Sequence, residues 1–208
     1  FARSESEGAV ELRLGGGGSV LVHSDTLAID ARFGGKTVLS VKAPNLVGAR
    51  VQDFVADDTE RFAGVGHGFF GRVDKLDLSG TEVTRTYARG TFQQAPLVVP
   101  FFVSSKRYGV LVNSDLDTTF SFRTARGYGF RLPEVEASHL DYFVFLGESL
   151  GDVLDGYTEI TGRPRLPQKG MFGLALSDKS EPNNSDAVFW QNKVLAQRRA
   201  GLAVDHLV

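Results

Sequence analysis

Two segments of the sequence place chemically useful side chains beside elements that can hold them. Residues 64–71 read GVGHGFFG, a glycine-rich segment with two adjacent aromatic residues. Asp178 follows the apolar run FGLALS at 172–177, which is typical of a buried parallel strand. Aromatic rings can pack on a sugar ring, and a carboxylate can accept hydrogen bonds from hydroxyl groups. The candidate substrate-binding residues are therefore His67, Phe69, Phe70 and Asp178.

Both segments also have other interpretations. A nucleotide-binding glycine loop needs a strand before it and a helix after it. Residues 72–87 are charged, turn-rich and strand-like, which argues against a nucleotide. The glycines can also mark a strand and loop where backbones pass closely, because glycine has no Cβ. Asp178 can alternatively be a loop residue that caps the helix after it.

The remaining titratable residues favour structural roles. Asp57 and Asp58, like Asp115 and Asp117, lie in turn-like sequence, where Asp bonds its own backbone. Asp205 lies inside an apolar strand and needs a buried partner. No Ser/His/Asp set and no nucleophile elbow can be identified, so we assign no catalytic residue. Metal-ligand spacing is absent, and we predict no metal site from the scattered histidines: His23, His67, His139 and His206.

Composition excludes several classes of protein. A length of 208 residues predicts one or two domains, and a hydrophobic content of 42% is enough for a packed core. The net charge of −2 argues against nucleic acid or an anionic membrane as the main partner. The absence of cysteine excludes disulfides and thiolate metal sites. No apolar run is long enough to span a bilayer.

Residues 1–147 predict a β-sandwich, which makes the fold class mainly β. Residues 10–14 and 27–33 alternate apolar and polar side chains, as strands with one buried face do. Frequent turn signals between many short strands favour a sandwich over a parallel sheet. Further strands are expected at 37–43, 82–87, 97–104, 108–113, 118–123 and 140–146.

Helices are predicted only near the C-terminus. Ser149 caps the first helix, Asp152 suits its N-terminal dipole, and Gly162 ends it. Its buried face is expected to hold Val153, Leu154, Tyr157 and Ile160. A second helix runs from about 185 to 201, and its buried side is expected to hold Val188, Phe189, Val194 and Leu195. The apolar strands on either side of it complete a β-α-β unit, which needs further elements to cover it.

Four blocks of the sequence resemble glycoside hydrolase family 31. Residues 60–67, ERFAGVGH, resemble its "ERF-x-G-hydrophobic-G-E/H" signature. Residues 100–110, PFFVSSKRYGV, are similar to its "PF-hydrophobic-SS-x-x-YG" strand pair. The passage DYFVFLG at 141–147 and YTEITGRP at 157–164 resembles its entry into the catalytic barrel. GLAVD at 201–205 resembles its second barrel strand, with Ala203 where Pro is usual.

The resemblance implies a galactose-mutarotase-like sandwich followed by the truncated start of a (β/α)8 barrel. The implied domains are the sandwich at 1–147, a linker helix and Gly-Arg-Pro connection at 148–167, and the first β-α-β of the barrel at 168–208. It implies retaining cleavage or transfer at α-linked glycosides, without a cofactor. An Asp nucleophile and an Asp acid/base are expected beyond Val208. The implied partners are an oligosaccharide or α-glycoside substrate and the remainder of the barrel, with no nucleic acid and no membrane.

The branch of the family is suggested by departures from its common pattern. His67 stands where Glu is usual, and the following GFFGR is unlike ordinary α-glucosidases. The segments GHGFFGR and ALSDK look closer to the α-glucosyl or isomaltosyl transferases. The ordinary α-glucosidase and α-xylosidase branches remain open.

Two other functions remain as alternatives. A non-catalytic carbohydrate-binding or structural sandwich would have no use for the β-α-β segment at 171–208. A mutarotase-like enzyme would need a His and a carboxylate that converge, and the sequence shows no such pair. The chain starts at Phe1 without an initiator Met or a basic-then-apolar leader, which predicts a trimmed or processed product. Secreted and cytoplasmic locations both stay open.

Overall fold

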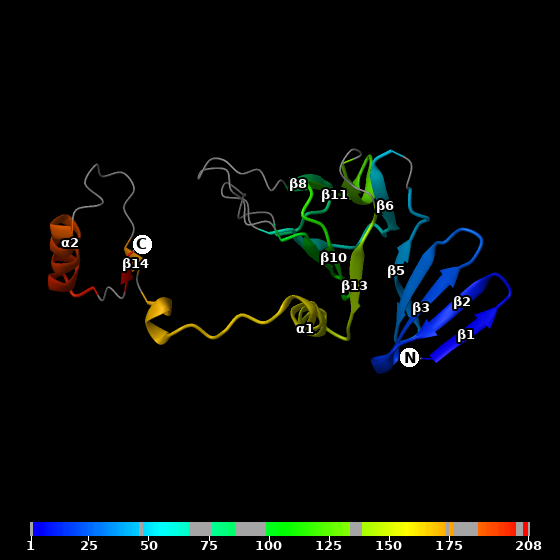
Figure 1. Cartoon of the computed structure of the whole chain (residues 1–208), viewed down its shortest axis with the longest axis horizontal. Helices are drawn as coiled ribbons and strands as arrows, with labels where there is room; N and C mark the ends of the chain where they lie inside the picture. Colours follow the sequence, from blue (N-terminus) through cyan, green and yellow to red (C-terminus); the bar gives the residue numbers. More distant parts are fainter. Residues whose placement is uncertain are drawn as a thin grey trace. The chain divides into compact units, whose positions relative to one another are not determined.

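The structure is a computed structural model, and it divides into two compact units, Phe1–Gly162 and Arg163–Val208. Each unit is described by itself (Figure 1). The residues described are 2–45, 48–66, 76–85, 99–133, 139–173, 175–176, 187–202 and 206–207.

The described part of the first unit consists of two antiparallel sheets and one α-helix. The larger sheet has the strand order β1-β2-β3-β4-β5-β6-β12-β11-β8, and the smaller has β13-β10-β9-β7. The elements are β1 (Ala2–Ser6), β2 (Ala9–Arg13), η1 (Gly15–Gly17), β3 (Gly18–His23), β4 (Ile29–Phe33), β5 (Lys36–Val41), β6 (Arg50–Val55), β7 (Phe62–Gly64), β8 (Thr81–Arg85), β9 (Phe101–Ser104), β10 (Tyr108–Val112), β11 (Thr118–Thr124), β12 (Gly127–Leu132), β13 (Tyr142–Leu146) and α1 (Leu150–Thr161).

Aromatic side chains from both sheets form the core between them. Phe62 of the smaller sheet lies 4.6 Å from Tyr128 of the larger one, measured between ring centroids. Phe102 meets Phe122 edge-on at 5.2 Å. Such tilted and edge-to-face pairs are the arrangements that aromatic rings prefer. The prediction of a mainly β fold is confirmed, and the two facing sheets explain why so many phenylalanines are buried.

Helix α1 begins and ends where the sequence predicts. The Ser149 hydroxyl accepts a hydrogen bond from the Asp152 amide at 3.2 Å, and the Asp152 carboxylate accepts one from the Ser149 amide at 2.8 Å. This reciprocal pair is a capping box. Gly162 has a φ of 91°, in the region that favours glycine, and its amide donates to the Thr158 carbonyl.

The buried face of α1 is narrower than predicted. Val153 is fully buried, and the ring of Tyr157 stacks on Phe101 at 4.1 Å. Leu154 and Ile160 are instead 47% and 53% exposed, so their predicted burial is wrong. The helix rests on β13 through Gly156, where an added Cβ would lie 3.2 Å from the Phe145 ring.

Each predicted strand segment contains a strand, but several boundaries shift. The segment 27–33 starts its strand only at Ile29, because Leu27 has a φ of 58°, outside the extended region. Strands β1, β3, β6, β7 and β12 were not among the predicted elements. Most of these hold glycine or charged residues that weaken the alternating signal.

The described part of the second unit consists of η2 (Lys169–Phe172), β14 (Ala175–Leu176), α2 (Ala187–Arg199) and β15 (His206–Leu207). Strands β14 and β15 pair in parallel, with Ala175 opposite His206. Phe172 was expected in the first strand, but it lies in η2 and is 70% exposed.

The predicted buried side of α2 is not found in the described residues, since none of its residues is buried. Val188 is 61% exposed and Leu195 is 41% exposed, while Phe189 and Val194 are half-buried. Among the described residues of this unit, η2 and the two-residue strands offer too little surface to cover an apolar helix face.

The close contact between α1 and β10 depends on Gly109. An added Cβ there would lie 2.7 Å from the Phe101 ring and 2.8 Å from the Val153 side chain. We expect Gly109→Ala to lower the free energy of unfolding by about 1–3 kcal/mol, because overpacking forces core side chains out of place. Urea unfolding of the two proteins measures the difference. Gly15→Ala, where a Cβ would meet nothing within 4 Å, is the control. Equal stability of wild type and Gly109→Ala would contradict the packing argument.

Candidate functional site

The predicted substrate-binding residues His67, Phe69, Phe70 and Asp178 lie outside the described residues. The described residues nevertheless show how the strand that leads to His67 is held. They also reveal a buried polar network directly before that strand.

The segment Gly64-Val65-Gly66 turns sharply at the end of β7. Gly64 has a φ of 128°, and a Cβ there would lie 2.6 Å from the Phe101 carbonyl oxygen. Close backbone approach, one of the interpretations of this glycine-rich segment, is therefore observed at Gly64. Only glycine combines this φ with this approach.

Val65 continues the turn in a conformation that is rare for a β-branched residue. Its φ is 58°, and its side chain is fully buried. Its amide donates to the Phe101 carbonyl at 2.7 Å, and its carbonyl accepts a hydrogen bond from the Arg85 side chain. Such strain persists only where the surroundings fix it. The turn is thus anchored to both β8 and β9.

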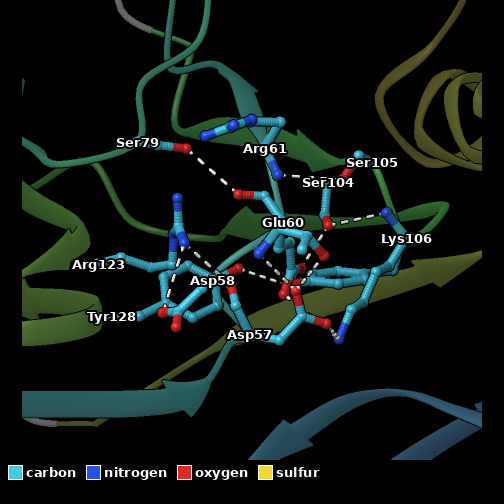
Figure 2. A network of polar contacts seen from close by, with 12 residues as sticks. Asp57, Asp58, Glu60, Arg61, Ser79, Ser104, Ser105, Lys106, Arg123 and Tyr128 are labelled. Atoms are coloured by element: carbon cyan, nitrogen blue, oxygen red, sulfur yellow. Dashed lines mark hydrogen bonds and ion pairs between the residues drawn. The ribbon is translucent and has the colours of Figure 1, made fainter.

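Glu60 is the centre of the buried polar network (Figure 2). Its side chain is 1% exposed. Its Oε1 accepts hydrogen bonds from the Tyr108 hydroxyl at 2.6 Å and from the Ser104 hydroxyl. The Tyr108 hydroxyl lies 2.6 Å from that of Tyr128, which belongs to the other sheet. The network therefore joins the two sheets through the core.

Lys106 lies between two carboxylates of this network. Its Nζ is 2.6 Å from Oδ2 of Asp57 and 3.7 Å from Oε2 of Glu60. Asp57 also accepts hydrogen bonds from the amide and hydroxyl of Thr59, as predicted for a turn residue. The ammonium group thus supplies the positive charge that a buried carboxylate needs.

The network stabilises the charged forms of Asp57 and Lys106 and the neutral forms of its tyrosines. The hydrogen bond from Lys106 holds the pKa of Asp57 well below its usual range. Burial opposes the charge on Lys106, but Asp57 and Glu60 outweigh it and raise its pKa. Burial, with the nearby charge of Glu60, raises the pKa of Tyr108, and burial also raises that of Tyr128. At neutral pH Asp57 and Lys106 are charged and both tyrosines are neutral donors.

The other titratable residues that the structure describes show no catalytic arrangement. His23 Nε2 lies 3.3 Å from Asp30 Oδ2, and Asp30 accepts a hydrogen bond from Ser40 at 2.5 Å. Within the described ranges, no three His, Asp or Glu residues come together as metal ligands. In the same part of the chain, no helix has the length and hydrophobicity to span a membrane.

A groove of about 600 Å³ lies between the N-terminal strands and β13. Its lining is mainly apolar, and its polar residues are Arg50, Gln52, His139 and Tyr142. It is lined by Val22, Leu27, Ile29, Val41, Pro44, Arg50, Gln52, His139, Leu140 and Tyr142.

Searches of known sequences found related enzymes, although no protein-family model matches the chain. The chain is 33% identical over 126 residues to an α-glucosidase 2 of Bacillus thermoamyloliquefaciens, a match to 56% of this chain and 15% of that protein. It is 32% identical over 133 residues to an isomaltosyltransferase of Sporosarcina globispora, covering 62% of this chain and 12% of the relative. The chain thus matches less than a fifth of the length of either relative.

Solved structures share the fold. A Flavobacterium johnsoniae dextranase of glycoside hydrolase family 31, complexed with isomaltotriose, matches 95% of this chain and 25% of its own, with a TM-score of 0.78 at 20% identity. A cycloalternan-forming enzyme of Listeria monocytogenes, in complex with a pentasaccharide substrate, matches 95% of this chain and 20% of its own, with a TM-score of 0.74 at 23% identity.

The network predicts that removing the Lys106 charge destabilises the fold. In Lys106→Met, Glu60 stays buried without its nearby cation, and we expect the free energy of unfolding at neutral pH to fall by about 2 kcal/mol. Urea unfolding measures the loss. In the background of Glu60→Gln, Lys106→Met should lower the free energy of unfolding by clearly less, because no buried charge remains. An identical cost in both backgrounds would show that the two groups are not coupled.

The lowered pKa of Asp57 predicts a loss of stability in acid. A carboxyl group with a lowered folded-state pKa stabilises the fold above its unfolded value of 3.8, and this contribution disappears as the pH falls through the folded-state pKa. Unfolding free energies measured between about pH 6 and pH 2 should fall more steeply for wild type than for Asp57→Asn. Parallel curves would mean that Asp57 has no such role. Asp115→Asn, at another turn carboxylate, is the control.

Proposed function

Because the chain is a relative of the glycoside hydrolase family 31 enzymes, we propose that it forms the N-terminal part of a retaining enzyme that hydrolyses or transfers α-linked glycosides. The similarity to an α-glucosidase and an isomaltosyltransferase carries this proposal. The motif blocks support it, because they occur in the family's order between residues 60 and 208. The activity is proposed for a protein that extends beyond the matched region.

The proposed architecture is a galactose-mutarotase-like sandwich at 1–147, a connection at 148–167 and the first β-α-β of a (β/α)8 barrel at 168–208. The parallel pairing of β14 with β15 around α2 supports the last part. Exposed apolar residues in this unit also support it, because further barrel elements would cover them: Met171, Phe172, Val188, Leu195 and Leu202.

The proposed chemistry needs two carboxyl groups about 5–5.5 Å apart, one as nucleophile and one as acid/base. We assign neither to a residue of this chain. Asp178 is proposed to accept hydrogen bonds from sugar hydroxyls at the barrel mouth, and His67, Phe69 and Phe70 are proposed as further substrate-binding residues. The oligosaccharide complexes of the dextranase and the cycloalternan-forming enzyme support an α-linked oligosaccharide as substrate.

A non-catalytic carbohydrate-binding or structural sandwich is the alternative. The parallel strand pair of the second unit gives it less support, because a stand-alone sandwich has no use for such a pair.

An activity assay tests the proposal. The 208-residue chain should not turn over aryl α-glucoside, α-xyloside or α-galactoside, because both catalytic carboxylates are expected elsewhere. A longer protein with the following barrel should do so, and Asp178→Ala in it should lower kcat/KM by about one to two orders of magnitude, the equivalent of one charged hydrogen bond.

Glu7→Ala, at an exposed carboxylate of the first unit, is the control in the longer protein. Turnover by the 208-residue chain that survives repurification would contradict the proposal that both catalytic carboxylates lie outside these residues. Full activity of Asp178→Ala would remove this residue from the site and leave the reaction class untouched.

A further inference from the structure

The outward face of β6, β12, β11 and β8 carries two rows of mostly polar residues. Strand pairing places four residues opposite one another in the first row: Asp53, Gly129, Ser121 and Glu82. The second row is Val51, Arg131, Thr119 and Thr84. Alternate residues of a strand share a face, so both rows lie on one surface. The row between them points into the core and includes Phe120 and Phe130.

This surface is hollowed into a polar trough. Two hollows of about 420 and 70 Å³ lie there and share Asp53 and Arg126 as lining residues. Gly129 has no side chain and so leaves a gap in the first row. Only glycine fits there, because a Cβ would lie 2.1 Å from the Gln52 carbonyl oxygen. The backbone packing that requires this glycine therefore also opens the trough between Asp53 and Ser121.

Charged groups along the trough have unused hydrogen-bonding capacity. Among the described residues, neither the half-buried Asp53 carboxylate nor the Lys42 ammonium has a hydrogen-bond or ion-pair partner. Arg123 is 19% exposed, and its Nη1 donates to the Asp57 carbonyl and lies 3.9 Å from Asp58. Its buried Nε has no partner in the part of the chain that the structure describes. A guanidinium group has five N–H donors, so most of its capacity is unused.

The backbone at Arg123 is unusual as well. The pairing of β11 with β12 shifts between Ser121 and Thr124, which marks a bulge, and Arg123 within it has a φ of 54°. Bulges redirect side chains and occur often beside functional sites. A strained residue of this kind is a sound starting point for a functional hypothesis.

The trough carries charges of both signs. Three carboxylates and four cations line it: Asp53, Asp58, Glu82, Lys42, Arg123, Arg126 and Arg131. Such a surface offers hydrogen-bond donors and acceptors side by side, and each sugar hydroxyl can both donate and accept a hydrogen bond. The four strands span about 14 Å at their normal spacing, which suits several linked sugar units better than a small ion.

We propose that this trough binds a neutral oligosaccharide. All of its residues belong to the first unit. The proposal therefore depends neither on the barrel nor on any catalytic carboxylate.

Titration of the ¹⁵N-labelled 208-residue chain with isomaltotriose tests the proposal. We expect a dissociation constant in the range of about 1 mM, with amide shifts grouped at 51–53, 82–84 and 119–131. Ser121→Trp fills the trough and should weaken binding about tenfold, and Asp53→Ala should weaken it too. Thr37→Trp and Glu5→Ala, at exposed positions on other strands of the same sheet, are the matched controls and should bind as wild type does.

Several outcomes would overturn the proposal. One is the absence of shifts up to about 50 mM isomaltotriose or maltotriose. Another is binding that Ser121→Trp leaves unchanged although its spectrum shows a folded protein. Equal shifts with glycine or sulfate in place of the sugar would show a site for small ions instead.

Discussion

The carboxylate of Glu60 is removed from water, and the arrangement of the first unit depends on how that charge is compensated. Burying an ion costs several kcal/mol unless hydrogen bonds and an opposite charge replace the lost hydration. Here Ser104 and Tyr108 donate to it, and Lys106 lies nearby. These groups come from β9, β10 and the turn between them, and Tyr128 extends the contact to the opposite sheet. Sliding of the two sheets past each other would break the hydrogen bond between Tyr108 and Tyr128.

The elements next to Glu60 and its partners are the turn between β9 and β10 and the strand β7. The turn between β9 and β10 holds Arg107 at a φ of 67° and leads into β10, where Gly109 lies against Val153 of α1. On the other side, Glu60 immediately precedes β7, whose end is held by Val65. The start of the glycine-rich segment is therefore held in place by hydrogen bonds to the neighbouring strand. In the described part of the chain, Glu60 and its partners join the two sheets of the first unit.

Local patterns in the sequence predicted local structure well. The capping box at Ser149 and the stop at Gly162 need only neighbouring residues, and both are confirmed. The network could not be predicted, because Glu60 and Tyr108 are 48 residues apart and a single sequence does not show which distant residues meet. Strand β12 was missed because Gly127 and Gly129 lower its strand propensity. Leu154 and Ile160 were misplaced because helical spacing does not show how wide the covering surface is. His67, Phe69, Phe70 and Asp178 remain predictions.

The order of strands in the larger sheet has a consequence for how the chain folds. From β1 to β6 each strand pairs with its neighbour in sequence, but β6 then pairs with β12, where Gln52 lies opposite Phe130. Closing that pair brings together residues 78 positions apart, since 130 minus 52 is 78. The chain loses the entropy of loop closure before such a contact stabilises the fold, so topologies of this kind fold slowly. The N-terminal meander can form early during synthesis, whereas the aromatic core must wait until β12 has emerged from the ribosome. Until then the apolar inner side of the meander is exposed, and the nascent chain is open to aggregation and to chaperones.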